Sequence, residues 1–167
     1  MRTVCKLSVA VLALVVSSAT AARAQSNNAF IQASADVQTP INVTGVQPLA
    51  FGNVFPGVIK LVDPSDLTNA GRFDVTGQAS APVTLSFTLP AALGSGPNSM
   101  PIDNYSAIRA QDAMQSVGPL LFAPGAANGA TLSGTGALFV WVGARVTPTV
   151  NQAAGLYTGN ITMTVVY

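Results

Sequence analysis

The residues that could carry out chemistry in this sequence are few, and most of them are aspartates. The 167-residue chain has no histidine, and its six acidic residues are all aspartate. Without histidine, the usual general base of hydrolytic triads is missing. Two aspartates held a few ångströms apart could still serve a carbohydrate-active enzyme. Asp63 and Asp66 share a turn in which calcium could bind, although the spacing of a calcium-binding loop is absent.

The other reactive groups give no further candidate. Cys5 is the only cysteine and lies before the apolar run at the N-terminus. Thiol catalysis and thiolate metal sites are therefore unavailable once that segment is removed. We predict no catalytic residue, no bound metal and no cofactor, and we keep the carboxylate enzyme as the distant alternative.

The first 24 residues have the features of an export signal. Arg2 and Lys6 precede an apolar run at 7–16, and Ala22-Arg23-Ala24 fits the small-x-small cleavage rule. The run is short for a membrane anchor, which is the alternative interpretation. We predict a signal peptide over 1–24 and an exported mature chain, located in the periplasm, at the cell surface or outside the cell, with no membrane span.

The charge of the mature chain limits its partners. After residue 24 the sequence keeps four basic and six acidic residues, a net charge of −2. No basic surface is available for nucleic acid. No cysteine remains to form a disulfide, so stability must come from apolar burial and backbone pairing.

The mature chain reads as an all-β protein. It contains no glutamate and Lys60 is its only lysine, so strong surface helix formers are scarce. Segment 137–142 is apolar on both sides, which predicts a central strand, with Trp141 in or beside the core. Short strands separated by turns are typical of an antiparallel sandwich. The predicted strands are 30–37, 41–46, 48–54, 57–62, 71–76, 83–89, 104–109, 120–122, 130–133, 137–146 and 161–167, with a loop at 90–101 and one helical turn at 110–115.

Three strings in the sequence resemble a known family. They are PLAFGNVFPG at 48–57, GRFDVTG at 71–77 and the closing AGLYTGNITMTVVY. Together they resemble the exported bacterial proteins of domain-of-unknown-function family 4402. The closing string is also similar to the last strand of chaperone–usher pilins and of spore-coat-protein-U-like pilus subunits. The sequence departs from those pilins in two ways. They usually carry the tyrosine one place before the end, whereas here Tyr167 is the last residue, and many of them have a disulfide.

The resemblance to pilins implies an immunoglobulin-like sandwich that lacks one strand. In such a subunit the N-terminal extension of a neighbour fills the gap. Segment 29–38 is the candidate donor, because apolar residues alternate with a second set in which all but Phe30 are polar. The same alternation fits a first strand of the chain's own sandwich. The domains are therefore 1–24, 25–38 as N-terminal strand or donor, and 39–167 as the sandwich.

The resemblance leads to a functional expectation. We expect a non-enzymatic, pilin-like or fimbrial surface subunit for adhesion or biofilm formation. Its partners would be copies of itself, with a periplasmic chaperone and an outer-membrane usher. The alternative is a self-contained periplasmic or cell-surface binding module. The residues predicted at the strand-exchange interface are Ala29, Ile31, Ala33, Ala35 and Val37 of the donor and Ile161, Met163, Val165 and Tyr167 of the last strand.

Overall fold

The computed structural model describes residues 27–167. They fall into two units, which divide after Asp36, and the larger unit is Val37–Tyr167. Within the smaller unit, residues 27–36 form no strand and are all exposed. No helix within the described part of the chain has the length and apolar character to cross a membrane. The predicted signal peptide at 1–24 lies outside the described residues.

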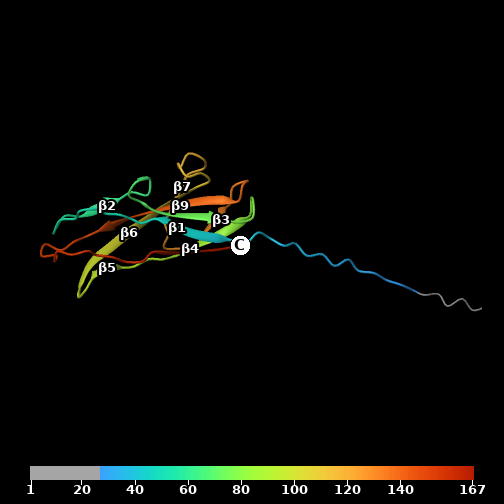
Figure 1. Ribbon diagram of the computed structural model, residues 1–167, viewed down its shortest axis with the longest axis horizontal. Helices are drawn as coiled ribbons and strands as arrows, with labels where there is room; N and C mark the ends of the chain where they lie inside the picture. Colours follow the sequence, from blue (N-terminus) through green and yellow to red (C-terminus); the bar gives the residue numbers. More distant parts are fainter. Residues whose placement is uncertain (1–26) are drawn as a thin grey trace, which may run out of the picture. The chain divides into compact units, whose positions relative to one another are not determined.

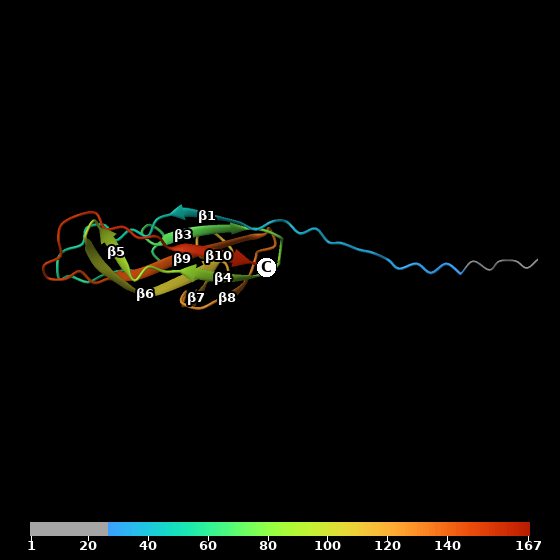
Figure 2. The same cartoon turned by 90° about the horizontal axis from the view of Figure 1, so that it is seen from below.

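The larger unit is an all-β antiparallel sandwich, as predicted, and residues 27–167 contain no helix. A seven-stranded sheet has the order β1-β3-β9-β6-β5, with β2 paired to β9 and β7 paired to β6, and a three-stranded sheet has the order β10-β4-β8 (Figures 1 and 2). The strands are β1 (Asn42–Gln47), β2 (Lys60–Val62), β3 (Gly71–Thr76), β4 (Pro82–Thr88), β5 (Ala92–Ser95), β6 (Asn98–Ala110), β7 (Leu120–Phe122), β8 (Asn128–Thr131), β9 (Ala137–Val146) and β10 (Thr162–Val166).

The main core lies between the two sheets. Inward-facing residues such as Val75 and Val140 of the large sheet meet Leu85 and Met163 of the small one, and all four are buried. These side chains come from alternate positions of their strands, because successive residues of a strand point to opposite faces. The alternation of apolar and polar residues in the sequence therefore explains why these apolar side chains gather between the two sheets.

Strand β9 is central, as its two apolar faces predicted. It pairs with β3 on one side and with β6 on the other. Trp141 is buried on the face away from the small sheet, where Val62, Ala70 and Ala110 complete a second apolar cluster. Partly buried Leu49 and Phe51 pack on this cluster from the connection between β1 and β2.

Two predicted strands are absent. The expected strand at 30–37 is not part of the fold, and no residue from 27 to 41 is in a strand. The expected strand at 48–54 is a connection, because Pro48 follows β1 directly and Gly52 adopts φ +61°. The apolar residues Leu49 and Phe51 of this connection pack on the second cluster from a loop and not from a strand.

Two other predictions need correction. The loop predicted at 90–101 contains β5 and the start of β6, joined by a two-residue turn. Gly96, with φ +57°, takes the first turn position, where a left-handed residue matches the twist of the paired strands. The helical turn predicted at 110–115 is absent, and Gln115 has a positive φ there.

Candidate functional site

The two sheets end in edge strands on the same side of the sandwich. Strand β1 pairs only with β3, and β10 pairs only with β4. The two edge strands contact each other but form no ladder together. Within the described residues, each strand therefore has one side of its backbone without a ladder partner, and unpaired edges of this kind are where β-proteins add strands.

Tyr167 links the two edges at one end of the sandwich. Its hydroxyl donates a hydrogen bond to the Thr39 carbonyl, just before β1. It also accepts a hydrogen bond from the backbone N–H of Gln78 at 2.8 Å. The residue that follows β10 is thus joined to the segment that leads into β1 and to the turn after β3. We call this the closed end.

This bonding leads to a testable expectation for Tyr167→Phe. Losing the hydroxyl removes one donor and one acceptor from exposed backbone partners, so the free energy of unfolding should fall by about 1 kcal/mol. Thr164→Val, an exposed change within β10, should stay within about 0.5 kcal/mol of the wild type. Urea denaturation followed by circular dichroism measures both. Equal midpoints for the two variants would mean that the hydroxyl does not hold the closed end.

At their other end, the two edges lead to a cavity of about 1310 Å³. Its walls are residues 45–56, which run from β1 into the following connection, and residues 152–162, which lead into β10. The floor is apolar and includes Phe73, Met100, Ile102, Val142 and Val146. Among residues 27–167, no charged side chain lines the cavity. The lining of the cavity reaches β1 at Gly45 and β10 at Thr162. We call this cavity, together with the edges of β1 and β10 that lead from it toward Tyr167, the groove, and the cavity its open end.

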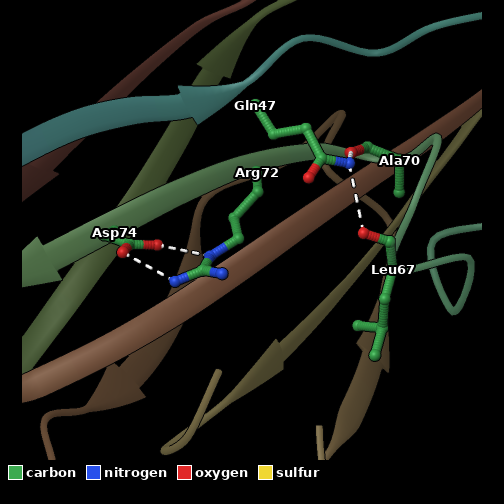
Figure 3. Close-up of polar contacts among 5 residues, drawn as sticks. All are labelled: Gln47, Leu67, Ala70, Arg72 and Asp74. Carbon is green, nitrogen blue, oxygen red and sulfur yellow. Dashed lines mark hydrogen bonds and ion pairs between the residues drawn. The ribbon is translucent and has the colours of Figure 1, made fainter. Parts of the chain in front are cut away.

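Figure 3 shows how Gln47, the last residue of β1, is held beside the open end. Its side-chain amide donates to the carbonyls of Leu67, Thr68 and Ala70 at 3.2, 2.8 and 2.9 Å. The two hydrogens of this amide nitrogen are thus shared among three backbone acceptors of the turn that precedes β3. This fixes the point at which the wall of the groove leaves the sheet.

Most of this architecture falls within a known protein family. The family described as "Domain of unknown function (DUF4402)" matches residues 52–167. The chain belongs to the DUF4402 family. No curated protein matches the chain. The matched part of this DUF4402 protein contains β2 to β10, most of the cavity floor and the wall at 152–162, while β1 and segment 25–38 precede it.

The predicted residues of the last strand lie beside the groove. Met163 is buried in the main core, and Ile161 and Val165 are half-buried against it. Ile161 also lines the cavity. Tyr167 is exposed, and its hydroxyl forms the hydrogen bonds of the closed end. The alternation of side chains along the strand did not predict these hydrogen bonds.

The predicted donor residues Ala29, Ile31, Ala33, Ala35 and Val37 are all exposed and belong to no strand. Ile31 is 95% exposed and Val37 is 92% exposed. Large aliphatic side chains usually gain about 1.5–3 kcal/mol each when they are buried. Their exposure is what a segment awaiting a partner would show, and its pairing with a second copy stays a prediction.

The aspartates of the turn at 63–66 are engaged in local hydrogen bonds. Asp63 accepts from the backbone and hydroxyl of Ser65, and Asp66 accepts from Thr68 and Asn69. The Ser65 hydroxyl chiefly lowers the pKa of Asp63, and the Asn69 amide chiefly lowers the pKa of Asp66. Both carboxylates act as turn caps, and residues 27–167 contain no cluster of three metal-ligating side chains.

The remaining aspartates of the sandwich also have protein partners. Asp74 forms a two-pronged ion pair with Arg72 at 2.7 and 2.8 Å, drawn in Figure 3. Asp103 pairs in the same way with Arg145 across β6 and β9, and this hydrogen-bonded partner lowers the pKa of Asp103. Asp112 accepts hydrogen bonds from Ser116, which lower its pKa. None of the aspartates of the described residues lines the cavity.

Tyr105, on β6, makes a half-buried polar contact. Its hydroxyl donates to the Pro90 carbonyl at 2.7 Å. Burial, with the nearby charge of Asp103, raises the pKa of Tyr105 to about 12. The phenol is thus held neutral as a hydrogen-bond donor, which is a structural role.

Proposed function

We propose that this DUF4402 protein is an exported, non-enzymatic structural subunit that assembles with copies of itself by strand donation. Segment 29–38 of one copy would lie in the groove of another and pair with the free edge of β10. The observation that carries the proposal is the cavity, whose described lining is neutral and whose floor is apolar, lying at the ends of two strand edges that have no ladder partner in the described residues. Adhesion or biofilm formation is the role that such a fibre would serve.

The donor and the groove match in length. Ten extended residues span about 33 Å. That length is sufficient to follow the five residues of β10 and continue into the cavity. Backbone hydrogen bonds to β10 would supply affinity, since both partners offer unpaired groups.

The donor and the groove also match in chemistry. The apolar side chains of 29–38 share one face of an extended strand, and that face would rest on the apolar floor. The opposite face, which includes Gln32, Ser34 and Asp36, would remain in water. Because the part of the cavity lining that the structure describes has no charged residue, filling the cavity with aliphatic groups leaves none of these lining residues as an ionised group without water.

Two matched double variants of the full mature chain test this proposal. Ile31→Asp with Val37→Asp places two charges on the face that would enter the groove, and this variant should lose the ladder of SDS-resistant oligomers that the wild type shows on unboiled gels. Gln32→Asp with Gln38→Asp adds the same charge to the opposite face and should keep the ladder. A ladder that persists unchanged in the first variant would contradict strand donation, as would a wild type that forms none.

Deletion of residues 25–38 separates this proposal from the alternative of a self-contained binding module. A subunit without its donor should be a monomer that is prone to aggregation, because its own groove stays open and no copy can fill it. Adding the peptide 27–38 should raise its melting temperature progressively as the peptide concentration increases. The apolar lining of the cavity favours the binding module as second candidate, since ligand sites are lined mainly by hydrophobic side chains, although its volume of about 1310 Å³ exceeds the roughly 300–1,000 Å³ typical of such sites. Such a module would remain a stable monomer after the deletion, and the peptide would not change its melting temperature.

A further inference from the structure

The sandwich has strand edges without a ladder partner on a second side as well. Within the described residues, β7 of the large sheet pairs only with β6, and β8 of the small sheet pairs only with β4. Arg109 of β6 pairs with Leu120 of β7, and its side chain donates a hydrogen bond to the Gly129 carbonyl of β8, so β7 and β8 border the same side. The strand orders place this side opposite to β1 and β10. An incoming strand would find unpaired backbone groups here too.

The two strands of this second side are poor templates for an added strand. They have three and four residues, and short edge strands offer few backbone groups. Pro119, which has no backbone N–H, directly precedes β7. The side-chain amide of Asn128 donates to the carbonyls of Ala123 and Ala126 at 3.0 and 2.6 Å, which holds the connection between β7 and β8 in place. This side is therefore protected by its backbone as well as by its side chains.

Arg109 adds a positive charge to the second side. Its guanidinium carbon lies 6.0 Å from the centre of the Phe122 ring of β7. The same side chain lines a shallow hollow on the small sheet with Thr84, Gly129 and Thr131. The guanidinium thus reaches from the large sheet to β8, where it occupies the Gly129 carbonyl. A strand that paired with β8 would have to displace this group or remove its charge from water, and both cost free energy.

The edge of β10 has none of these protections. It is five residues long, contains neither a charged residue nor a proline, and keeps a regular register with β4. Strand β1 is also uncharged, but its register shifts between Gly45 and Gln47, and such a bulge interrupts pairing. Two further edges are short or covered, because β2 has three residues and β5 exchanges two backbone hydrogen bonds between Gly94 and Thr158. Within residues 27–167, β10 is therefore the edge best suited to an added strand.

We propose that Arg109 is the residue that confines strand addition to the β10 side, so that each copy accepts one donated strand and the assembly stays unbranched. This selectivity rests on the proposed strand donation, which it extends by naming the edge that is closed to a second strand. What Arg109 excludes from β8 is an edge strand of another copy of this chain.

Arg109→Met tests this role, because methionine keeps a long side chain but removes the charge and the hydrogen bond. The change is made in the mature chain that carries Ile31→Asp with Val37→Asp, so that donation of 29–38 is blocked and any association arises elsewhere. Arg145→Met in the same background is the matched control, since Arg145 is an exposed arginine that pairs with Asp103 on the large sheet. Light scattering after size-exclusion chromatography measures the association constants. Arg109→Met should self-associate about tenfold more tightly than Arg145→Met, because losing a hydrogen bond to a charged group changes an equilibrium constant by that order.

A second variant shows whether this association occurs at β8. Thr131→Lys, added to Arg109→Met, places a new charge at an exposed position of β8 and should restore the monomer. Association that Thr131→Lys does not reverse would be due to lost stability and would overturn the role of Arg109. Equal association of Arg109→Met and Arg145→Met would also overturn it, while ladders formed by the unmodified chain would still support strand donation. If the unmodified chain forms no ladder but Arg109→Met associates reversibly through β8, strand donation is wrong and the protection of β8 by Arg109 stands.

Discussion

Trp141→Ala is expected to lower the free energy of unfolding by about 3–5 kcal/mol, the usual range for truncating a buried tryptophan. Trp141 is 1% exposed and lies on the central strand β9, packed with Val62, Ala70 and Ala110. The connection that covers it begins at Gln47, which is hydrogen-bonded to the turn before β3, so this end of the connection has limited freedom to fill the vacated volume. The guanidinium of Arg72, 5.7 Å from the centre of the indole ring, would also lose its aromatic contact.

Urea denaturation followed by far-ultraviolet circular dichroism measures this loss, since the variant removes the only tryptophan and with it that fluorescence signal. Leu121→Ala is the control, and it should change stability by less than about 0.5 kcal/mol because its side chain is already exposed. A loss below about 1 kcal/mol for Trp141→Ala would mean that the second apolar cluster contributes little to the fold.

Gly136→Ala is expected to cost more than about 2 kcal/mol, although it adds a single methyl group. Gly136 has φ +78°, a conformation that alanine rarely adopts. A β-carbon at this position would lie 2.2 Å from the carbonyl oxygen of Gly77, so the backbone must move. That movement would disturb the hydrogen bond from the Gly77 N–H to the Gly136 carbonyl, which is 2.8 Å long.

Gly134→Ala provides the matched comparison for Gly136→Ala. A β-carbon at Gly134 meets no atom within 4 Å, and its φ is not in the left-handed range. This variant should be neutral or slightly more stable, within about 0.5 kcal/mol, because alanine restricts the unfolded chain. Thermal unfolding of the two variants side by side gives the difference. If both variants melt at the temperature of the wild type, the backbone near Gly136 can accommodate the added methyl group without loss of stability, and the prediction is wrong.

The strands that the sequence predicts best are those whose side-chain pattern is complete. The range 71–76 coincides with β3 and 137–146 with β9, because β3 alternates and β9 is apolar on both faces. The hairpin of β5 and β6 was predicted as a loop, since its glycine, proline, serine and asparagine are also common in loops. In that segment the turn needs Gly96, while the paired residues contribute backbone hydrogen bonds more than large side chains.

The candidate site was predicted only in part. Alternation identified the inward face of Ile161, Met163 and Val165, but it carries no information about which neighbour an edge strand will have. For the same reason 29–38 fitted both a strand of its own sandwich and a donated strand. The walls of the groove come from two irregular connections that are distant in sequence, so no periodic pattern marks them.

The order in which strands pair along the chain has a kinetic consequence. Gly71 pairs with Val142, and Met163 pairs with Phe87, so both sheets depend on partners that are far apart in sequence. All-β domains dominated by such pairings fold in milliseconds to seconds, much more slowly than helical bundles of similar size. Until β9 and β10 are in place, the earlier strands are solvent-exposed and available to other chains. Refolding yield should therefore fall as protein concentration rises, because misassociation is second order in chains whereas correct sheet closure is first order.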